Sequence, residues 1–84
     1  MLVEKVEKEN LNIVFVYTTC SNKEEARSIG LACIEKKLAV CCDSWEVNSM
    51  YPWKGVLQEV GQYMVTLTTE KRLSSQLIEF VGAI

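Results

Sequence analysis

The residues best placed to take part in chemistry lie in the segment Tyr17-Thr18-Thr19-Cys20, where an apolar run ends directly before a helix start. Two hydroxyl groups and a thiol stand together at the end of a predicted strand. In α/β folds, the junction between a strand end and a helix start is a common place for a binding site. The segment is therefore our first candidate for a functional site.

The remaining cysteines favour packing over metal chemistry. The chain has four cysteines, at positions 20, 33, 41 and 42, and no C-x-x-C pair, which excludes a zinc ribbon or a thioredoxin-type site. Adjacent Cys41 and Cys42 on a strand point to opposite faces and chelate one ion poorly. We predict that Cys33, Cys41 and Cys42 are small buried hydrophobes, because free cysteine is among the most buried residue types.

The length and composition of the chain favour a small domain that associates with another subunit, and they argue against nucleic-acid binding and catalysis. The 84 residues are enough for one small domain, and 49% hydrophobic residues in so short a chain favour burial against another subunit. The net charge of −2 argues against nucleic acid as a partner. The chain contains no histidine, and no nucleophile has an identifiable base, so we expect no enzyme.

The sequence also carries expectations about location. The first ten residues are rich in charge, which excludes a secretory signal there. No stretch approaches the ~20 apolar residues that a membrane-spanning helix needs. We therefore expect a cytoplasmic protein without membrane insertion.

The first half of the chain predicts a strand and a helix after a loose leader over residues 1–11. Residues 12–18 form an apolar, largely β-branched run, typical of a central strand. Ser21 and Glu24 form a capping box that starts a helix at residue 22 or 23. The predicted buried stripe of this helix consists of Ala26, Ile29, Gly30 and Cys33, widened by Leu31, Ala32 and Ile34.

The second half predicts a β-hairpin followed by a helix. Residues 38–53 and 56–69 read as two strands joined by a turn at Lys54-Gly55. Thr69 is predicted to cap the second helix, whose apolar stripe consists of Leu73, Leu77, Val81 and Ile84. Three aromatic residues of the hairpin are predicted to form an interface between subunits rather than a ligand pocket: Tyr51, Trp53 and Trp45.

The element order β-α-β-β-α is that of an α+β, ferredoxin-like fold without its final strand, with an antiparallel sheet and two helices on one face. We assign it to residues 12–84. In the complete fold the sheet order is 4-1-3-2, so the missing strand would leave residues 12–18 at an open edge. Such an apolar edge recruits another strand or aggregates. We predict that another chain or the leader covers it.

Over residues 13–84 the sequence resembles the N-terminal two-thirds of the CutA divalent-cation tolerance family. The resemblance is carried by four motifs in order: Val16-Tyr17-Thr18-Thr19-Cys20, Glu35-Lys36-Lys37-Leu38-Ala39 followed by Cys41, Tyr51-Pro52-Trp53-Lys54-Gly55, and Leu67-Thr68-Thr69. The chain departs from the family at Pro52, where an aromatic residue is usual, and at Thr68, where lysine is usual. It also lacks the family's His-Pro-Tyr segment and final strand.

The resemblance implies a cytoplasmic or organellar homotrimer, linked to tolerance of divalent metal ions and without catalysis. It also places Cys20 at the position of a copper-associated cysteine. A helix dipole favours a thiolate there, and sulfur suits Cu(I). A loop thiol of no special role explains Cys20 equally well. The alternative function is a regulatory or scaffold module, similar to the PII signalling proteins, that binds a small ligand or a protein between subunits.

Overall fold

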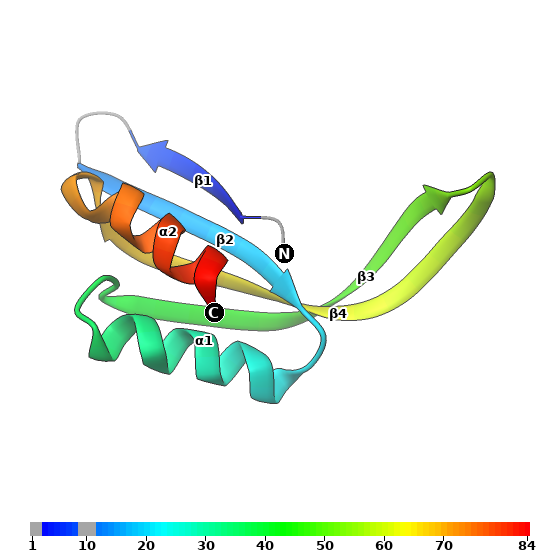
Figure 1. The fold of residues 1–84 in the computed structure, drawn as a ribbon, viewed down its shortest axis with the longest axis horizontal. Coiled ribbons are helices and arrows are strands. Elements are labelled where there is room, and N and C mark those ends of the chain that lie inside the picture. Colours follow the sequence, from blue (N-terminus) through cyan, green and yellow to red (C-terminus); the bar gives the residue numbers. More distant parts are fainter. Residues whose placement is uncertain (1–2, 9–11) are drawn as a thin grey trace.

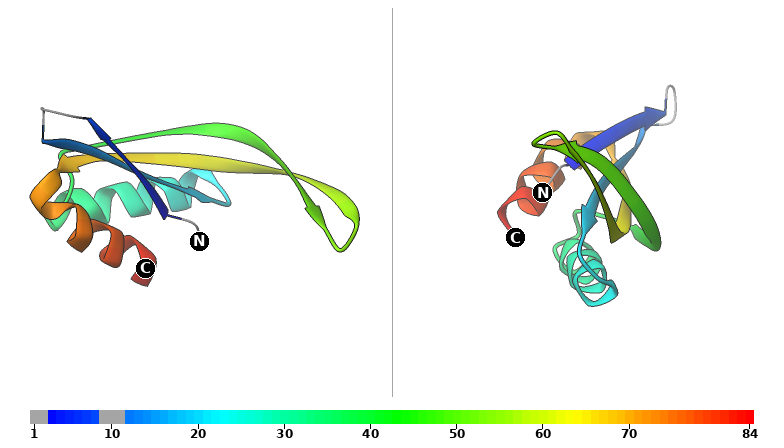
Figure 2. Two further views of the ribbon diagram at one scale, coloured as in Figure 1. Left: turned by 90° about the horizontal axis from the view of Figure 1, so that it is seen from above. Right: turned by 90° about the vertical axis from the view of Figure 1, so that its right-hand side faces the viewer.

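In the computed structural model, which describes residues 3–8 and 12–84, one antiparallel sheet carries two helices on one face (Figures 1 and 2). The strand order is β1-β2-β4-β3. The elements are β1 (Val3–Lys8), β2 (Ile13–Cys20), α1 (Lys23–Glu35), β3 (Cys41–Trp53), β4 (Val56–Glu70), a 3₁₀ turn (Lys71–Leu73) and α2 (Ser74–Ala83). The α+β, ferredoxin-like prediction with both helices on one face is confirmed.

The edge of the central strand β2 is covered by the N-terminal segment. β1 pairs antiparallel with β2, with Val3 opposite Thr18 and Lys8 opposite Ile13. The prediction of a loose leader over residues 1–11 is therefore wrong for residues 3–8; the rest of that range lies outside the described residues. The charges of this segment show no period of two, so its sequence alone does not indicate a strand, yet β2 supplies the pairing partner. Of the two predicted covers for this edge, the leader provides one.

β2 has one face in the core. Its burial alternates strictly along the strand, with Val14 and Val16 fully buried and Phe15 and Tyr17 half-buried on the opposite face. The alternation follows from the period of two, and it shows that the helices cover one face of the sheet only. The core joins this face to α1, β4 and α2 through the following buried hydrophobic residues: Val14, Val16, Cys20, Ala26, Ile29, Cys33, Ala39, Val65, Leu67, Leu77 and Val81.

Helix α1 begins at Lys23, one of the two predicted starts, but the predicted capping box of Ser21 and Glu24 is wrong. Its N-cap is Asn22, whose Oδ1 accepts a hydrogen bond from the Glu25 backbone N–H at 2.9 Å. Glu25 reaches back and accepts from the Ser21 N–H at 3.0 Å. The box is therefore Asn22 with Glu25, because asparagine caps as well as serine does. The predicted stripe is confirmed, whereas Leu31 and Ile34 are exposed.

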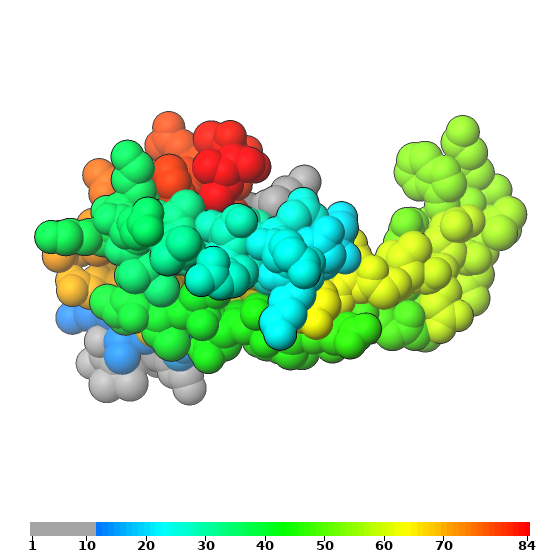
Figure 3. Space-filling view, turned by 90° about the horizontal axis from the view of Figure 1, so that it is seen from below, coloured from blue at the N-terminus to red at the C-terminus, as the bar shows by residue number. Residues whose placement is uncertain are grey.

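The strands of the hairpin, β3 and β4, have 13 and 15 residues, compared with eight for β2. Lys54 and Gly55 both have positive φ values, 51° and 78°, as a two-residue turn of type I′ requires. The distal half of the hairpin projects beyond the rest of the sheet (Figures 1 and 3). We call residues 47–62 the arm.

Thr69 does not cap the second helix. Its Oγ1 donates to the Leu38 carbonyl oxygen at 2.7 Å, which ties the end of β4 to the loop that leaves α1. α2 instead follows a 3₁₀ turn and packs Leu77 and Val81 into the core, while Ile84 is exposed. Within the described residues, no helix combines the length and apolar character needed to cross a membrane.

Candidate functional site

The predicted metal ligand Cys20 is the last residue of β2 and faces the helices. Its side chain is 6% exposed, and its Sγ donates a hydrogen bond to the Asn22 carbonyl oxygen at 3.5 Å. Thr18 precedes it on the same buried face. The thiol is thus a core group at the end of a strand rather than a thiol on a loop.

The surroundings of Cys20 favour its protonated form. Burial raises the pKa of the thiol, and the nearby Glu25 carboxylate adds to that rise, while a backbone hydrogen bond at Asn22 lowers the pKa by less. The net direction is opposite to the predicted stabilisation of a thiolate at this position, because burial disfavours the charged form.

The other thiols lie in different environments. Cys33 is fully buried, and burial, with a contribution from Cys42, raises its pKa to about 11. Cys42 is half-buried between the sheet and α1. Cys41 is exposed and donates to Asp43 Oδ2 at 3.6 Å. The prediction of three buried cysteines is wrong for Cys41, because it falls on the sheet face that no helix covers.

The donor set of one chain does not fit a closed copper site. Among the residues that the structure describes, no group of three His, Cys, Asp or Glu side chains is arranged to hold a metal ion. Cys20 contributes one protonated sulfur, and its neighbour Glu25 is engaged with Ser21. A closed Cu(I) or zinc site needs several deprotonated ligands at one point.

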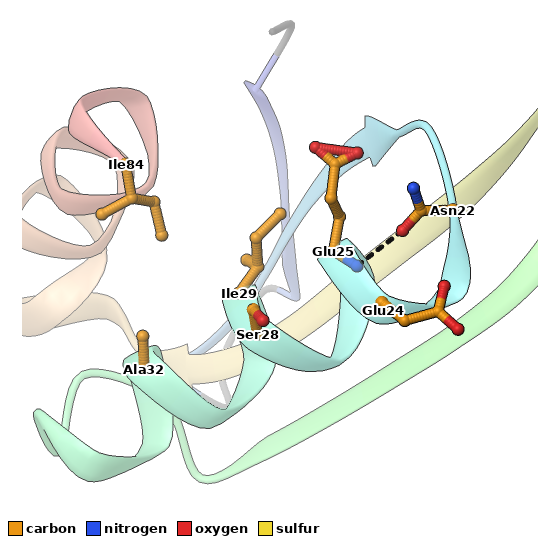
Figure 4. A pocket seen from close by; sticks show the side chains of 7 residues that line it. All are labelled: Asn22, Glu24, Glu25, Ser28, Ile29, Ala32 and Ile84. Carbon is orange, nitrogen blue, oxygen red and sulfur yellow. Dashed lines mark hydrogen bonds between the residues drawn. The ribbon is translucent and has the colours of Figure 1, made fainter.

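A groove lies between α1, from its N-cap to Ala32, and the C-terminal end of α2 (Figure 4). Its volume is about 580 Å³, and it is lined by Asn22, Glu24, Glu25, Ser28, Ile29, Ala32 and Ile84. Figure 4 shows the carboxylates of Glu24 and Glu25 at one end, Ile29 in the middle, and Ala32 and Ile84 at the other end. The groove therefore combines an acidic end with an apolar wall. Sequence reasoning missed it, because α1 and α2 are far apart along the chain.

The three predicted interface aromatics lie on the long hairpin and are exposed. Trp45, Tyr51 and Trp53 retain 47%, 44% and 60% of their accessible surface. Odd-numbered positions of one strand share a face, and here that face is opposite to Cys42, which contacts α1. Lys54 Nζ stands 5.8 Å from the Trp53 ring centre. The three side chains therefore have the same parity along β3 and are all exposed, with Trp45 in the body and the other two in the arm.

Sequence reasoning missed the other apolar side chains of the arm. Met50 and Leu57 are 63% and 68% exposed, and Val56 and Val60 are exposed too. Met50 is even-numbered and therefore lies on the opposite face from Trp53. Both faces of the arm are thus apolar and uncovered in one chain. The signal was the length of the hairpin. Strands of 13 and 15 residues extend beyond an eight-residue β2, so their distal residues have no neighbouring strand of the body to cover them.

The sequence of this chain is similar to a family of known proteins. The family model described as CutA1 divalent ion tolerance protein matches residues 14–84. The curated Protein CutA of Mus musculus is 33% identical over 69 residues, which cover 81% of this chain and 39% of that protein. The Divalent-cation tolerance protein CutA of Thermotoga maritima is 31% identical, with 80% of this chain and 66% of that protein covered.

Solved structures extend the likeness to three dimensions. The crystal structure of the divalent ion tolerance protein CutA1 from Ehrlichia chaffeensis has a TM-score of 0.84 at 27% identity, covering 87% of this chain and 69% of that one. The chain spans about two fifths of the length of the mouse relative. β1 precedes the matched segment. With fold, order of motifs and 71 matched residues in agreement, this chain belongs to the CutA1 divalent ion tolerance family.

Proposed function

We propose that this chain is a non-enzymatic, self-assembling protein of divalent metal ion tolerance, and that three copies form its working unit. The main support is the apolar arm, which no other element among residues 3–8 and 12–84 covers. Exposed apolar surface of this kind marks interaction sites in soluble proteins. Aromatic side chains such as Tyr51 and Trp53 are the residue types enriched at interfaces.

The open face of the sheet supports the same proposal. Phe15 and Tyr17 of β2 lie half-buried on the side without helices, and Trp45 lies on that side at β3. A further layer over this face would bury them, because a sheet face buries its apolar side chains by packing against another element. Copies that bring these faces together, with each arm against a neighbour, would cover both apolar surfaces at once.

Sedimentation equilibrium at micromolar concentration tests the assembly. We expect the mass of three chains for the parent protein and of one chain for a variant carrying Tyr51→Ser and Trp53→Ser. Val40→Ser is the matched control, because Val40 is 75% exposed and lies outside the arm. A parent protein that sediments as a single chain contradicts the proposal, and so does an arm variant with unchanged mass.

We further propose that any contact with copper is weak and runs through the Cys20 sulfur. Because burial raises the pKa of this thiol, binding must release a proton and therefore strengthens as pH rises. Calorimetric titration with Cu(I) at two pH values tests this, with Cys20→Ala as the variant and Cys41→Ala as the matched control. Equal heats from the parent and Cys20→Ala remove Cys20 as a ligand.

A second candidate function is that of a regulatory or scaffold module, which binds a small ligand or a protein at the groove between α1 and α2. The acidic end and apolar wall of that groove favour an amine with an apolar body. Growth of cells under copper stress, with and without the chain, separates the metal role from the regulatory one.

We propose the cytoplasm as the location of this protein. Among the similar proteins, the one from Archaeoglobus fulgidus is described as periplasmic and the one from Arabidopsis thaliana as chloroplastic.

A further inference from the structure

Cys33 and Cys42 lie on opposite sides of the contact between α1 and β3. Cys33 is on the buried stripe of α1 and is fully buried in the core. Cys42 is the second residue of β3, is half-buried and packs against the same core cluster. Neither thiol lines the groove beside α2, lies in the arm or takes part in the proposed copper contact at Cys20. The pair is therefore separate from the sites described above.

Gly30 allows β3 to approach α1 closely at this point. A Cβ on Gly30 would stand 2.9 Å from Cys42 Cβ and 2.4 Å from Cys42 Sγ. Cys33 follows Gly30 by three residues, and residues at that spacing lie on one side of a helix with their Cβ atoms about 5–6 Å apart. The Cys42 sulfur therefore lies within about one helical turn of Cys33.

The ionisation of the two thiols is a second sign that they are close. Burial raises the pKa of Cys33 to about 11, and the Cys42 thiol adds to that rise. Groups of like charge have this effect on each other at short range. A disulfide joins residues whose Cα atoms are about 4.4–6.8 Å apart, which is similar to the rise of one helical turn, about 5.4 Å. The contact between Cys33 and Cys42 is therefore on the distance scale of a disulfide bridge.

The fold disfavours the other pairings of thiols. β4 lies between the strands of Cys20 and Cys42, and two strand spacings of about 4.8 Å each exceed the reach of a disulfide. Cys20 precedes the start of α1, whereas Cys33 lies ten residues beyond Lys23, about 15 Å along the helix. Cys41 is exposed on the face of β3 opposite to Cys42. Cys33 and Cys42 are therefore the pair that can be joined within one chain.

The two thiols differ in access, and this difference sets the order of a reaction. Cys42 lines a groove between α1 and the start of β3, whereas Cys33 has no exposed surface. A reagent in solution therefore reaches Cys42 first. Burial raises the pKa of both thiols, so the first attack is slow. The second attack is faster, because Cys33 is already held next to its target.

We propose that Cys33 and Cys42 are a redox pair, which a small-molecule disulfide such as oxidised glutathione converts into an intramolecular disulfide. In the first step, Cys42 loses its proton and its sulfur attacks one sulfur of the reagent. The S–S bond of the reagent breaks, a mixed disulfide forms on Cys42, and one small thiol leaves with the released proton. In the second step, Cys33 loses its proton and attacks the Cys42 sulfur, and the second small thiol leaves. The two protein thiols are oxidised, and the reagent is reduced to two thiols.

The product is a covalent link between α1 and the start of β3. It closes the loop of residues 33–42, which restricts the unfolded chain and should raise the urea concentration needed for unfolding. Excess thiol reverses both steps. The packing of α1 on β3 is then fixed under oxidising conditions and held by non-covalent contacts under reducing ones. The proposal depends neither on metal binding nor on the arm.

Thiol counting on the double variant Cys20→Ala with Cys41→Ala tests the proposal, because this variant keeps only Cys33 and Cys42. After incubation in glutathione buffers of increasing oxidised fraction, the denatured protein should show the loss of both thiols and no bound glutathione. Dithiothreitol should restore both thiols. Adding Cys33→Ala to this background should stop the reaction at the mixed disulfide, with one glutathione bound per chain.

Peptide mapping locates the bond and does not depend on the folding of a variant. Trypsin cleaves after Lys36 and Lys37, which separate the two cysteines, so the oxidised parent chain should give two peptides joined by a disulfide. In urea unfolding of the double variant at one fixed concentration, the midpoint should rise on oxidation and return with dithiothreitol.

Three results would overturn the proposal. The first is two free thiols in the most oxidising buffer. The second is glutathione that stays on Cys42 while Cys33 remains free, which would mean that Cys33 cannot reach it. The third is a disulfide between two copies of the chain or one from Cys33 to Cys41, which would show that α1 and β3 do not hold the pair together.

Discussion

Replacing Gly30 by alanine tests how closely α1 lies against β3. A Cβ at this position would stand 2.4 Å from Cys42 Sγ and 2.9 Å from Cys42 Cβ. Both separations are well inside van der Waals contact. Rotating the Cys42 side chain would move its sulfur but not its Cβ, so the helix or the strand itself must shift.

The expected effect is the balance of two opposing contributions. Alanine is better than glycine in a helix interior by about 0.8–1.0 kcal/mol. Overpacking a tight contact costs about 1–3 kcal/mol, and two short contacts place Gly30→Ala at the upper end of that range. We therefore expect Gly30→Ala to lower the free energy of unfolding by about 1–2 kcal/mol.

Urea denaturation at one fixed protein concentration measures this change. Gly82→Ala is the matched control, because a Cβ at Gly82 meets nothing within 4 Å. The control should be neutral or stabilised by up to about 1 kcal/mol. In the double variant Gly30→Ala with Cys42→Gly, both short contacts disappear, so the cost of the alanine relative to Cys42→Gly alone should vanish or reverse.

Two results would refute this reasoning. One is a Gly30→Ala protein as stable as the Gly82→Ala protein, which would mean that α1 does not rest on Cys42. The other is a cost of Gly30→Ala that persists unchanged when Cys42 is glycine. In that case the source of the destabilisation lies elsewhere in the helix.

Three further predictions concern single side chains. Because the folded pKa of Cys33 is raised from 9.0 to about 11, stability should be complete below pH 9 and fall as pH rises toward 11, and Cys33→Ala should lose that part of the decline in pH-dependent unfolding. Asp43 raises the pKa of Cys41, so Asp43→Asn should speed its labelling by a disulfide reagent at pH 7.5 severalfold, and an unchanged rate would show that the contact is absent in solution. Thr69→Val should lose about 1–2 kcal/mol in urea unfolding, because it leaves the Leu38 carbonyl oxygen without its hydroxyl donor; full stability would mean that water replaces the donor.

Helices and turns were predictable from the sequence where the residue pattern is compatible with only one local structure. The stripe of Ala26, Ile29, Gly30 and Cys33 has helical spacing, and each of these residues is buried. The Lys54-Gly55 turn follows from the need for two positive φ values in a tight hairpin. Errors arose where neighbouring residues compete for one role. Ser21 and Asn22 are both good caps, and only the fold decides that Asn22 takes the position.

The contacts between distant segments were less predictable. Charges in β1 hide its strand character, because its pairing depends on the apolar edge of β2 rather than on its own pattern. The exposure of Cys41 depends on which face of β3 meets α1, and adjacent Cys42 has the same side chain. The sequence of β3 alone therefore predicts the same burial for Cys41 and Cys42. Their difference comes from the packing of Gly30 in α1 against Cys42.

The pairing of β1 with β2 also bears on the order of events during synthesis. β1 and β2 both precede the hairpin and α2 along the chain, so the most apolar strand of the sheet can pair with its first partner before those later elements are synthesised. Contacts that close over short stretches of chain form quickly. A nascent chain with this arrangement protects one edge of its most apolar strand early, and β4 later pairs with the other edge.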